Sequence, residues 1–308
     1  IKVLTQRARK YSNIPMLSRT HGQTASPTTM GKEFANFVHR ISSINKSVKG
    51  TILKGKINGA VGNFNAHLIA YPDVNWEIVS SKFIKGLGLE VNTHTTQVEP
   101  KDSIAELFFH YVRLNNVLID FSRDIWGYIS LGYFKQKLKK GEIGSSTMPH
   151  KVNPIDFENA EGNLGMANSN FLHLSNTVVI SRWQRDLTDS TVMRNIGLCY
   201  GYNNLALSSL LRGIYKLEIN KDQLKRDLDN SWEILTEAMQ TIFRKYQIKN
   251  GYELMKELSR GKEICKEDLH HMIDKIDIPL EERKVLKGLT PSSYTGIAKT
   301  LAKQLKDS

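Results

Sequence analysis

Apolar residues recur at three- and four-residue spacing along most of the chain, and the alternating pattern of strands is scarce. The clearest run follows Pro100, where large apolar side chains fall on one helical face over residues 104–129. Ser103 and Glu106 form a capping-box pattern at its start. The run continues to about residue 138, which predicts a helix of about 35 residues, on the order of 50 Å long. Such a helix needs a large bundle or a subunit interface to cover it.

Three further long helices are predicted. One begins at Ser26-Pro27, because proline suits the first helical position, and ends near residue 54. Another begins at Asn153-Pro154 and runs to about Val179, and the third spans residues 188 to about 213. The helix from Asn153 carries an unusual polar load, which suggests that one of its faces lines a site: Asn159, Asn163, Asn168 and Asn170.

The predicted helices become shorter after residue 213. Residues 220–308 hold shorter helical segments, separated by turns at residues 249–251, 260–261, 278–279 and 290–291. This shift predicts a central helical-bundle domain over residues 1–213 and a smaller helical domain over residues 214–308. The predicted fold class is all-α, a long-helix bundle with a smaller C-terminal helical domain.

The formal net charge of +12 calls for an anionic partner or a lysine-rich surface. The basic residues are spread along the chain, no nucleic-acid motif is present, and aromatic residues do not alternate with arginines. We therefore expect a basic surface with an anion-binding site, and no nucleic-acid partner. No apolar run is long enough to cross a bilayer, so no membrane partner is expected either.

Two cysteines in 308 residues make no disulfide framework, which fits a reducing, cytoplasmic compartment. The nine histidines lack the spacing of a metal site, so neither a metal nor another cofactor is expected. Residues 1–7 contain no initiator Met and no apolar signal-peptide core. The chain is therefore expected to be part of a longer polypeptide.

Residues 144–154, with the sequence GSSTMPHKVNP, form the most informative polar segment. Glycine lets backbone N–H groups approach an anion, and a helix that begins at Pro154 adds its positive dipole end. Lys151 adds a charge, and Ser145 and Ser146 add hydroxyls that could carry a proton. Taken alone, the segment is also compatible with a polar turn that leads into a helix.

Three other segments carry polar residues that an ordinary bundle would not need. Residues 18–23 include His21, which can act as an acid or a base near neutral pH. Residues 58–71 begin with paired glycines, and residues 95–97 offer a polar contact to them. Residues 181–194 place Arg185 and Arg194 around Ser190, a set suited to a phosphate. Nearby Asp186 and Asp189 could instead neutralise these arginines.

Residues 144–154 resemble the signature of the fumarase/aspartase superfamily. All four segments together resemble the adenylosuccinate lyase family across essentially the whole chain, from residues 15–23 to the short C-terminal helices. His150 and residues 182–194 narrow the resemblance to this family. It implies β-elimination of fumarate from adenylosuccinate, which gives AMP, and from the succinylated aminoimidazole carboxamide ribotide, both in purine biosynthesis.

The resemblance assigns roles residue by residue. Ser145 matches the catalytic base, His21 matches the general acid, and Glu158 matches the carboxylate that pairs with this histidine. Ser146 borders Ser145, and the sequence leaves open which serine is the base. The other matches are expected to bind the substrate, with Lys151 and Asn153 on the succinyl carboxylates: Thr20, Gln97, Ser146, Lys151, Val152, Asn153, Asn159, Arg185, Ser190, Thr191 and Arg194.

Members of this family are homotetramers whose active sites draw on three subunits. They also have an N-terminal domain that contacts the substrate, and the resemblance implies that residues 1–308 do not include it. The resemblance therefore implies a homotetramer with shared sites for a small nucleotide substrate, and an isolated chain that is inactive. Two alternatives remain at this point: another fumarate-releasing lyase, such as argininosuccinate lyase, or a non-catalytic basic helical scaffold.

Overall fold

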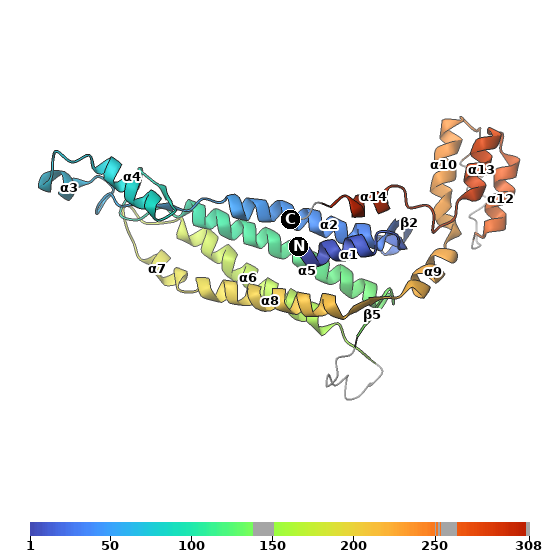
Figure 1. Cartoon of the computed structure of the whole chain (residues 1–308), viewed down its shortest axis with the longest axis horizontal. Helices are drawn as coiled ribbons and strands as arrows, with labels where there is room; N and C mark the ends of the chain where they lie inside the picture. Colours follow the sequence, from blue (N-terminus) through green and yellow to red (C-terminus); the bar gives the residue numbers. More distant parts are fainter. Residues whose placement is uncertain (138–150, 250, 252, 254–263, 306–308) are drawn as a thin grey trace. The chain divides into compact units, whose positions relative to one another are not determined.

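The computed structural model describes residues 1–137, 151–249, 251, 253 and 264–305. Helices make up most of these residues, which confirms the predicted all-α fold class (Figure 1). The strands are short and form three two-stranded sheets, β1–β2, β3–β4 and β5–β6. None of the described helices combines the length and the apolar character that crossing a bilayer requires.

The chain folds into two compact units, and each unit draws on separate stretches of the sequence. The first contains residues 1–39, 129–135 and 218–308, and the second contains residues 40–128 and 136–217. The second unit therefore ends close to the predicted domain boundary at residue 213. The division into domains 1–213 and 214–308 stays a prediction.

The first unit begins with helix α1 (Lys2–Lys10), a hairpin of β1 (Pro15–Thr20) and β2 (Gln23–Thr29), and the start of α2 (Met30–Gly50). Apolar side chains of its C-terminal helices form one core, which includes Leu17 of β1 and Phe243. The C-terminal elements are α9 (Lys221–Asp229), η1 (Trp232–Leu235), α10 (Thr236–Lys245), α12 (Lys266–Lys275), α13 (Leu280–Gly288) and α14 (Ala298–Lys303).

The helix predicted to begin at Ser26-Pro27 is wrong at its start, because these residues belong to strand β2. The ladder between β1 and β2 is antiparallel, with an irregularity between Met16 and Ser18. Pro27 lies in this irregular stretch, where its lack of an N–H group removes no ladder hydrogen bond. Helix α2 begins only at Met30 and ends at Gly50.

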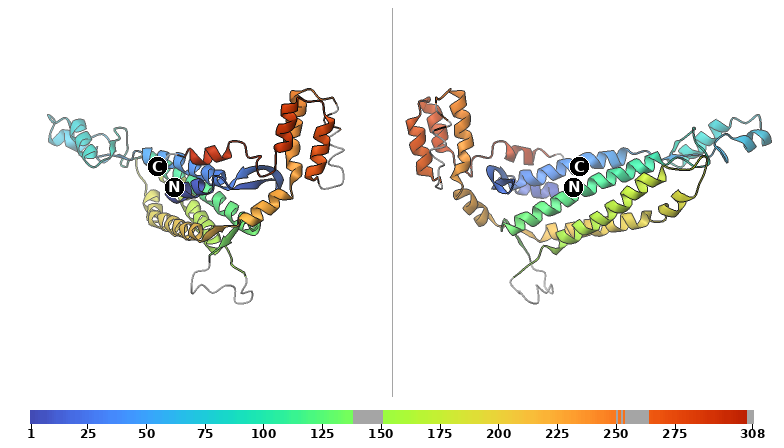
Figure 2. Two further views of the ribbon diagram at one scale, coloured as in Figure 1. Left: turned by 45° about the vertical axis from the view of Figure 1, so that its right-hand side comes forward. Right: turned by 180° about the vertical axis from the view of Figure 1, so that it is seen from behind.

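The second unit is built around helices α5 (Asp102–Ser130), α6 (Ile155–Val178) and α8 (Ile196–Lys216), which run side by side (Figures 1 and 2). Their core includes Phe108, Phe171 and Cys199, and the Tyr111 and Phe171 rings stack at 5.3 Å. The remaining elements of this unit are β3 (Lys54–Gly55), α3 (Asn65–Ala70), α4 (Trp76–Gly86), β4 (Glu90–Val91) and α7 (Thr188–Met193). Strands β5 (Phe134–Gln136) and β6 (Leu217–Ile219) each contain residues that are assigned to both units.

Two predicted helices differ from those observed. Helix α5 ends at Ser130 instead of residue 138, because Gly132 takes a left-handed conformation, with φ 74°, before the chain enters β5. Ser103 lies inside α5 and is not its cap, since its buried hydroxyl has no hydrogen-bond partner among the described atoms. The helix predicted from residue 188 to 213 is split into α7 and α8 at Arg194-Asn195.

Candidate active site

His21 lies at the tip of the β1–β2 hairpin, in a two-residue turn closed by the pair Thr20 and Gln23. Both central residues have positive φ, 52° at His21 and 75° at Gly22. This is the backbone of a type I′ turn, which favours asparagine or glycine over histidine at its first central position. Both Thr20 and His21 are exposed. The hairpin therefore presents the imidazole to solvent on a constrained backbone.

The beginning of α6 carries a second set of predicted site residues. Lys151 and Asn153 are exposed just before the helix, and the Val152 carbonyl accepts a hydrogen bond from Gln136 Nε2 at 2.9 Å. Glu158 is exposed and accepts a hydrogen bond from Trp126 Nε1 at 3.0 Å. Ser145, Ser146 and His150 lie outside the described residues, so their roles stay predictions.

A buried ion-pair cluster anchors this beginning of α6 to the end of α8. Asp156 lies 2.8 Å from Lys216 Nζ and 3.2 Å from Arg212 Nε, and the Asp156 and Lys216 side chains are at most 9% exposed. Arg212 also donates to the Ser209 hydroxyl, which in turn donates to Asn159 Oδ1 at 2.7 Å. The exposed Glu158 and Asn159 thus stand on a backbone that buried charges fix. We call this region, with residues 151–161, the Glu158 end.

The other end of the same bundle carries the predicted phosphate residues. The Gln97 N–H donates to the Gln184 carbonyl at 3.2 Å, which joins the residue 95–97 loop to the segment with Arg185. Lys56 Nζ lies 2.7–2.9 Å from three carbonyls, those of Gly59, Thr96 and Gln97. Burial lowers the pKa of Lys56. The three carbonyls accept hydrogen bonds from all three N–H groups of its ammonium. We call this region, with residues 95–101 and 181–194, the Arg185 end.

Charges at the Arg185 end are only partly compensated. Asp189 lies 2.6 Å from Lys101 Nζ and 3.2 Å from Arg185 Nη1. Burial of Asp189 acts to raise its pKa, but hydrogen bonds from Lys101 and the Ser190 N–H outweigh this and lower it. Asp186 pairs with Arg182, so of the two arginines that Asp186 and Asp189 were expected to neutralise, Arg185 has the expected carboxylate partner, Asp189. Arg194 is exposed, and no ion pair or hydrogen bond of its side chain is recorded within the described part of the chain.

Ser190 and Thr191 lie on the short helix α7, between Arg185 and Arg194. Thr191 Oγ1 donates to the Leu187 carbonyl at 3.4 Å, whereas the Ser190 N–H donates to Asp189 Oδ1. Donor side chains are thus present at this end on the exposed Gln97 and Arg194 and on the partly buried Ser190. Such a set of neutral and cationic donors suits a phosphate or another anion.

The predicted residues of the second unit therefore fall into two groups. Helix α6 has 24 residues, which separates the Glu158 end from the Arg185 end by about 35 Å. No single small molecule spans that distance. One copy of the chain consequently brings Glu158 together with Asn159, and Gln97 together with Arg185, but it does not bring these two groups to one site.

The asparagines of α6, whose number suggested that one face of the helix lines a site, have different surroundings in the structure. Asn168 is buried and forms a network with Asn115, Asn116 and Asn203, at 2.7–2.9 Å. These amides join α5, α6 and α8 in the core and specify how the helices pair. Asn170 donates to the Met166 carbonyl of its own helix.

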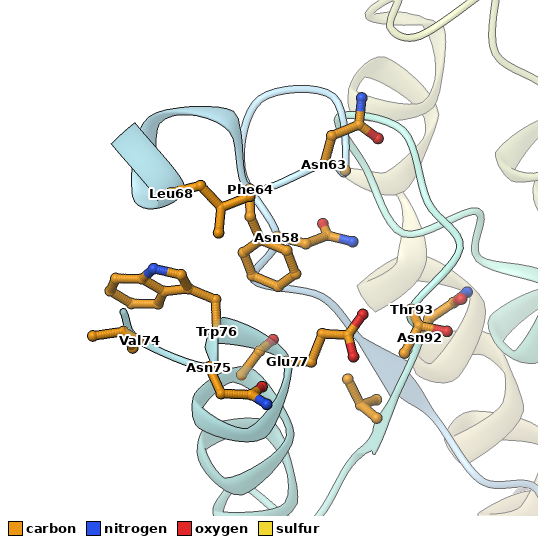
Figure 3. Close-up of a pocket in the computed structure, with 13 residues that line it drawn as sticks. Asn58, Asn63, Phe64, Leu68, Val74, Asn75, Trp76, Glu77, Asn92 and Thr93 are labelled. Atoms are coloured by element: carbon orange, nitrogen blue, oxygen red, sulfur yellow. The ribbon is translucent and has the colours of Figure 1, made fainter. Parts of the chain in front are cut away.

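A cavity of about 540 Å³ lies between the residue 58–64 loop, α4 and residues 91–93 (Figure 3). Its lining combines the Phe64 and Trp76 rings with amide and carboxylate groups from Asn58, Asn63 and Glu77. None of the predicted catalytic or substrate-binding residues lines it. Across the described residues, no group of three or more His, Cys, Asp or Glu side chains is arranged to hold a metal ion.

Several residues that support these positions have no local signal in the sequence. Lys56, Asp156 and Lys216 each lie within helical or loop segments whose pattern is ordinary. Each contacts a partner at least 40 residues away in the sequence, apart from the Gly59 carbonyl beside Lys56. A charged residue at an apolar position, as at Lys216, is the one hint that the sequence offers.

Comparison with known proteins agrees with the sequence resemblance. A lyase family model matches residues 1–167, and a model of the adenylosuccinate lyase C-terminal region matches residues 181–295. The adenylosuccinate lyase of Vibrio cholerae is 55% identical over 99% of the chain, and that of Haemophilus influenzae is 53% identical over 99%. The chain spans 67% of the length of each of these relatives.

Solved structures with lower identity share the fold. A fumarate lyase from Mesorhizobium sp. BNC1 superimposes with a TM-score of 0.71 over 98% of this chain and 69% of its own, at 20% identity. A 3-carboxy-cis,cis-muconate lactonizing enzyme from Pseudomonas putida gives 0.70 over 98% and 68%, also at 20% identity. With two family models along its length and relatives above 50% identity, the chain belongs to the adenylosuccinate lyases, C–N lyases of the fumarase/aspartase superfamily.

Proposed function

We propose that the chain supplies most of the active-site residues of an adenylosuccinate lyase in purine biosynthesis. The reaction cleaves the C–N bond of adenylosuccinate, and of the succinylated aminoimidazole carboxamide ribotide, by β-elimination. A base removes a proton from the succinyl Cβ, and that electron pair forms the double bond of fumarate. The C–N bond then breaks, and its electron pair stays on the nitrogen, which takes a proton from a general acid.

In this proposal Ser145 is the base and His21 is the acid. Glu158 pairs with the imidazole of His21, favours its charged form and holds its tautomer. The constrained turn at His21 supports this role, because a fixed backbone keeps an acid aligned with its leaving group. Lys151 and Asn153 hold the succinyl carboxylates.

The Arg185 end binds the nucleotide in the same proposal. Arg194, Arg185 and Ser190 receive the phosphate, and Gln97 binds the base or the sugar. The observation that carries this assignment is that α7 is flanked by the partly neutralised Arg185 before it and the exposed Arg194 after it. Charge-assisted hydrogen bonds from two guanidinium groups are strong enough to anchor a phosphate in water.

The separation of the Glu158 end from the Arg185 end supports a homotetramer with shared sites. Since about 35 Å of helix keeps these groups apart within one chain, a complete site requires a second copy that lies antiparallel to the first. Large apolar residues that the single chain leaves exposed support such an interface on α6 and α8: Met166, Leu172, Leu198, Leu205, Leu211 and Tyr215. A reducing, cytoplasmic location belongs to the same proposal, and both cysteines are free.

The experiment is a fumarate-release assay with adenylosuccinate on the complete enzyme that contains this chain. We expect His21→Ala and Ser145→Ala each to lower kcat by about 10²–10⁴, the range of general acid–base catalysis. Ser146→Ala in parallel separates the two adjacent serines. Unchanged kinetics in both the His21 and Ser145 variants would refute the assignment. The isolated 308 residues should release no fumarate, and wild-type rates from them would contradict the need for further residues.

A further inference from the structure

Four side chains from three separate parts of the sequence meet close to the tip of the hairpin that carries His21. Asp227 of α9 accepts a hydrogen bond from Arg19 Nη2 at 2.9 Å and one from the Tyr133 hydroxyl at 2.8 Å, both on Oδ2. Gln223 Nε2 donates to the other oxygen, Oδ1, at 2.9 Å. Both oxygens of the carboxylate are therefore engaged, and all four side chains belong to the first compact unit.

The surroundings make this network stronger than a surface ion pair. Tyr133 is completely buried, and burial is the main cause that raises its pKa to about 12, so its hydroxyl remains a hydrogen-bond donor. The side chains of Arg19 and Asp227 are 27% and 21% exposed. A partly buried carboxylate that accepts three hydrogen bonds, one of them from a charged donor, is held with little freedom.

Arg19 is two residues away from His21 on the same hairpin. In the ladder, Arg19 pairs with Thr24 and Thr20 pairs with Gln23, so the turn follows directly from the residue that Asp227 holds. Thr24 is itself tied to Glu233 Oε1 at 3.2 Å. His21 has no recorded side-chain contact of its own among the described residues, so its position depends on the backbone of the hairpin.

We infer that Asp227 is a positioning residue for His21 and acts through Arg19. It does not touch the substrate in this account. Its charge fixes Arg19 against Tyr133, the fixed Arg19 orients the hairpin, and the hairpin aims the imidazole. The inference rests on the proposed role of His21 as the general acid. It assigns to Arg19, Tyr133 and α9 a role in catalysis, although none of them is proposed to contact the substrate.

A double-mutant cycle on the complete enzyme tests the inference. Asp227→Asn keeps the size of the side chain and removes its charge. We expect kcat to fall about 10-fold with KM within about twofold, because small misplacements of a catalytic group slow chemistry more than binding. In a His21→Ala background, the same Asp227→Asn change should lower kcat by less than about twofold, since the group that it positions is already gone.

Asp229→Asn is the matched control, because Asp229 lies on the same helix and its pair with Lys225 is exposed. This variant should leave kcat unchanged. An equal loss from Asp227→Asn in both backgrounds would mean a general structural role and would overturn the inference, as would an unchanged kcat in the wild-type background. If Asp227→Asn does not fold, Arg19→Lys enters the same cycle, since it keeps the charge and loses the guanidinium geometry. Absence of fumarate release by the wild type would count against the proposed function instead.

Discussion

Asp227 beside the His21 hairpin pairs with one basic side chain, Arg19, and Asp189 at the Arg185 end pairs with two, Lys101 and Arg185, but the functional residue stands in a different place in each case. His21 lies outside the network of Asp227 and is only aimed by it. Arg185 lies inside the network of Asp189, which Lys101 shares. An arginine that already pairs with a carboxylate must weaken that ion pair to bind an anion, which lowers its net contribution to affinity. A residue that is only positioned by a network outside its own side chain loses no interaction when it acts. Arg194, to which no described residue provides an ion-pair partner, should therefore carry more of the affinity for a phosphate than Arg185.

The largest effect should come from Arg194→Gln. We expect KM for adenylosuccinate to rise about 100-fold, because a hydrogen-bonded charge in a binding site contributes roughly 1.5–3 kcal/mol. Arg185→Gln should raise KM less, because Asp189 already neutralises part of its charge. Steady-state kinetics on the complete enzyme measure both changes.

The control for Arg194 is Arg182→Gln, because Arg182 lies in the same segment, is 80% exposed and pairs with Asp186. Its KM should not change. A succinylated substrate without a phosphate sharpens the test, since the Arg194 variant should handle it as the wild type does. A larger effect at Arg185 than at Arg194 would reverse the comparison, and an equal loss with both substrates would contradict a phosphate role.

A smaller effect is expected at Lys56, which supports the Arg185 end without facing the ligand. Lys56→Met removes three hydrogen bonds to the Gly59, Thr96 and Gln97 carbonyls. The Gln97 loop should loosen, and KM should rise about 3–10-fold, in line with the modest net value of a hydrogen bond. Lys54→Met, at an exposed position on β3, is the control and should behave as the wild type. No change at Lys56 would mean that the Gln184 carbonyl alone holds this loop.

The smallest effect should come from Arg123→Gln. This variant tests whether the exposure of an ion pair or its short contacts decide how much it contributes to stability. Arg123 makes two hydrogen bonds to Glu161 Oε1, at 2.7 and 2.8 Å, but its side chain is 68% exposed. Exposed pairs of this kind contribute little to stability. The midpoint of thermal unfolding should stay within experimental scatter of the wild type. A clear drop would show that short contacts matter even in water, and would weaken the contrast with Asp227.

The sequence predicts the elements better than it predicts their ends. Helix α6 spans Ile155–Val178, close to the prediction that begins at Asn153-Pro154, because a proline marks its start. Helix α5 ends at Ser130, eight residues before the predicted end at residue 138, because β5 continues the apolar pattern after Gly132. Pro27 led to a helix start that was predicted too early, because proline is also tolerated in an irregular stretch of a strand.

The sequence proposes residues for the candidate site but gives no signal for the residues that support them. His21, Arg185 and Arg194 stand in segments whose composition points to chemistry. Asp227 stands in an ordinary amphipathic helix, and its partner Arg19 is 208 positions away. No periodicity links positions so distant, because only the folded chain brings them together. The separation of the Glu158 end from the Arg185 end is likewise a matter of geometry, which spacing in a sequence does not express.

The turn at His21 also records a conflict between folding and chemistry. An asparagine or a glycine would suit its backbone better than an imidazole does. Relaxing that strain would make the hairpin easier to form, and would at the same time remove the proposed acid. In a lineage that no longer needed the reaction, this position should therefore be among the first at which asparagine or glycine, which suit the positive φ, replaces histidine. In the proposal that His21 is the acid, this strain is the cost in folding free energy of placing an imidazole at the tip of the hairpin.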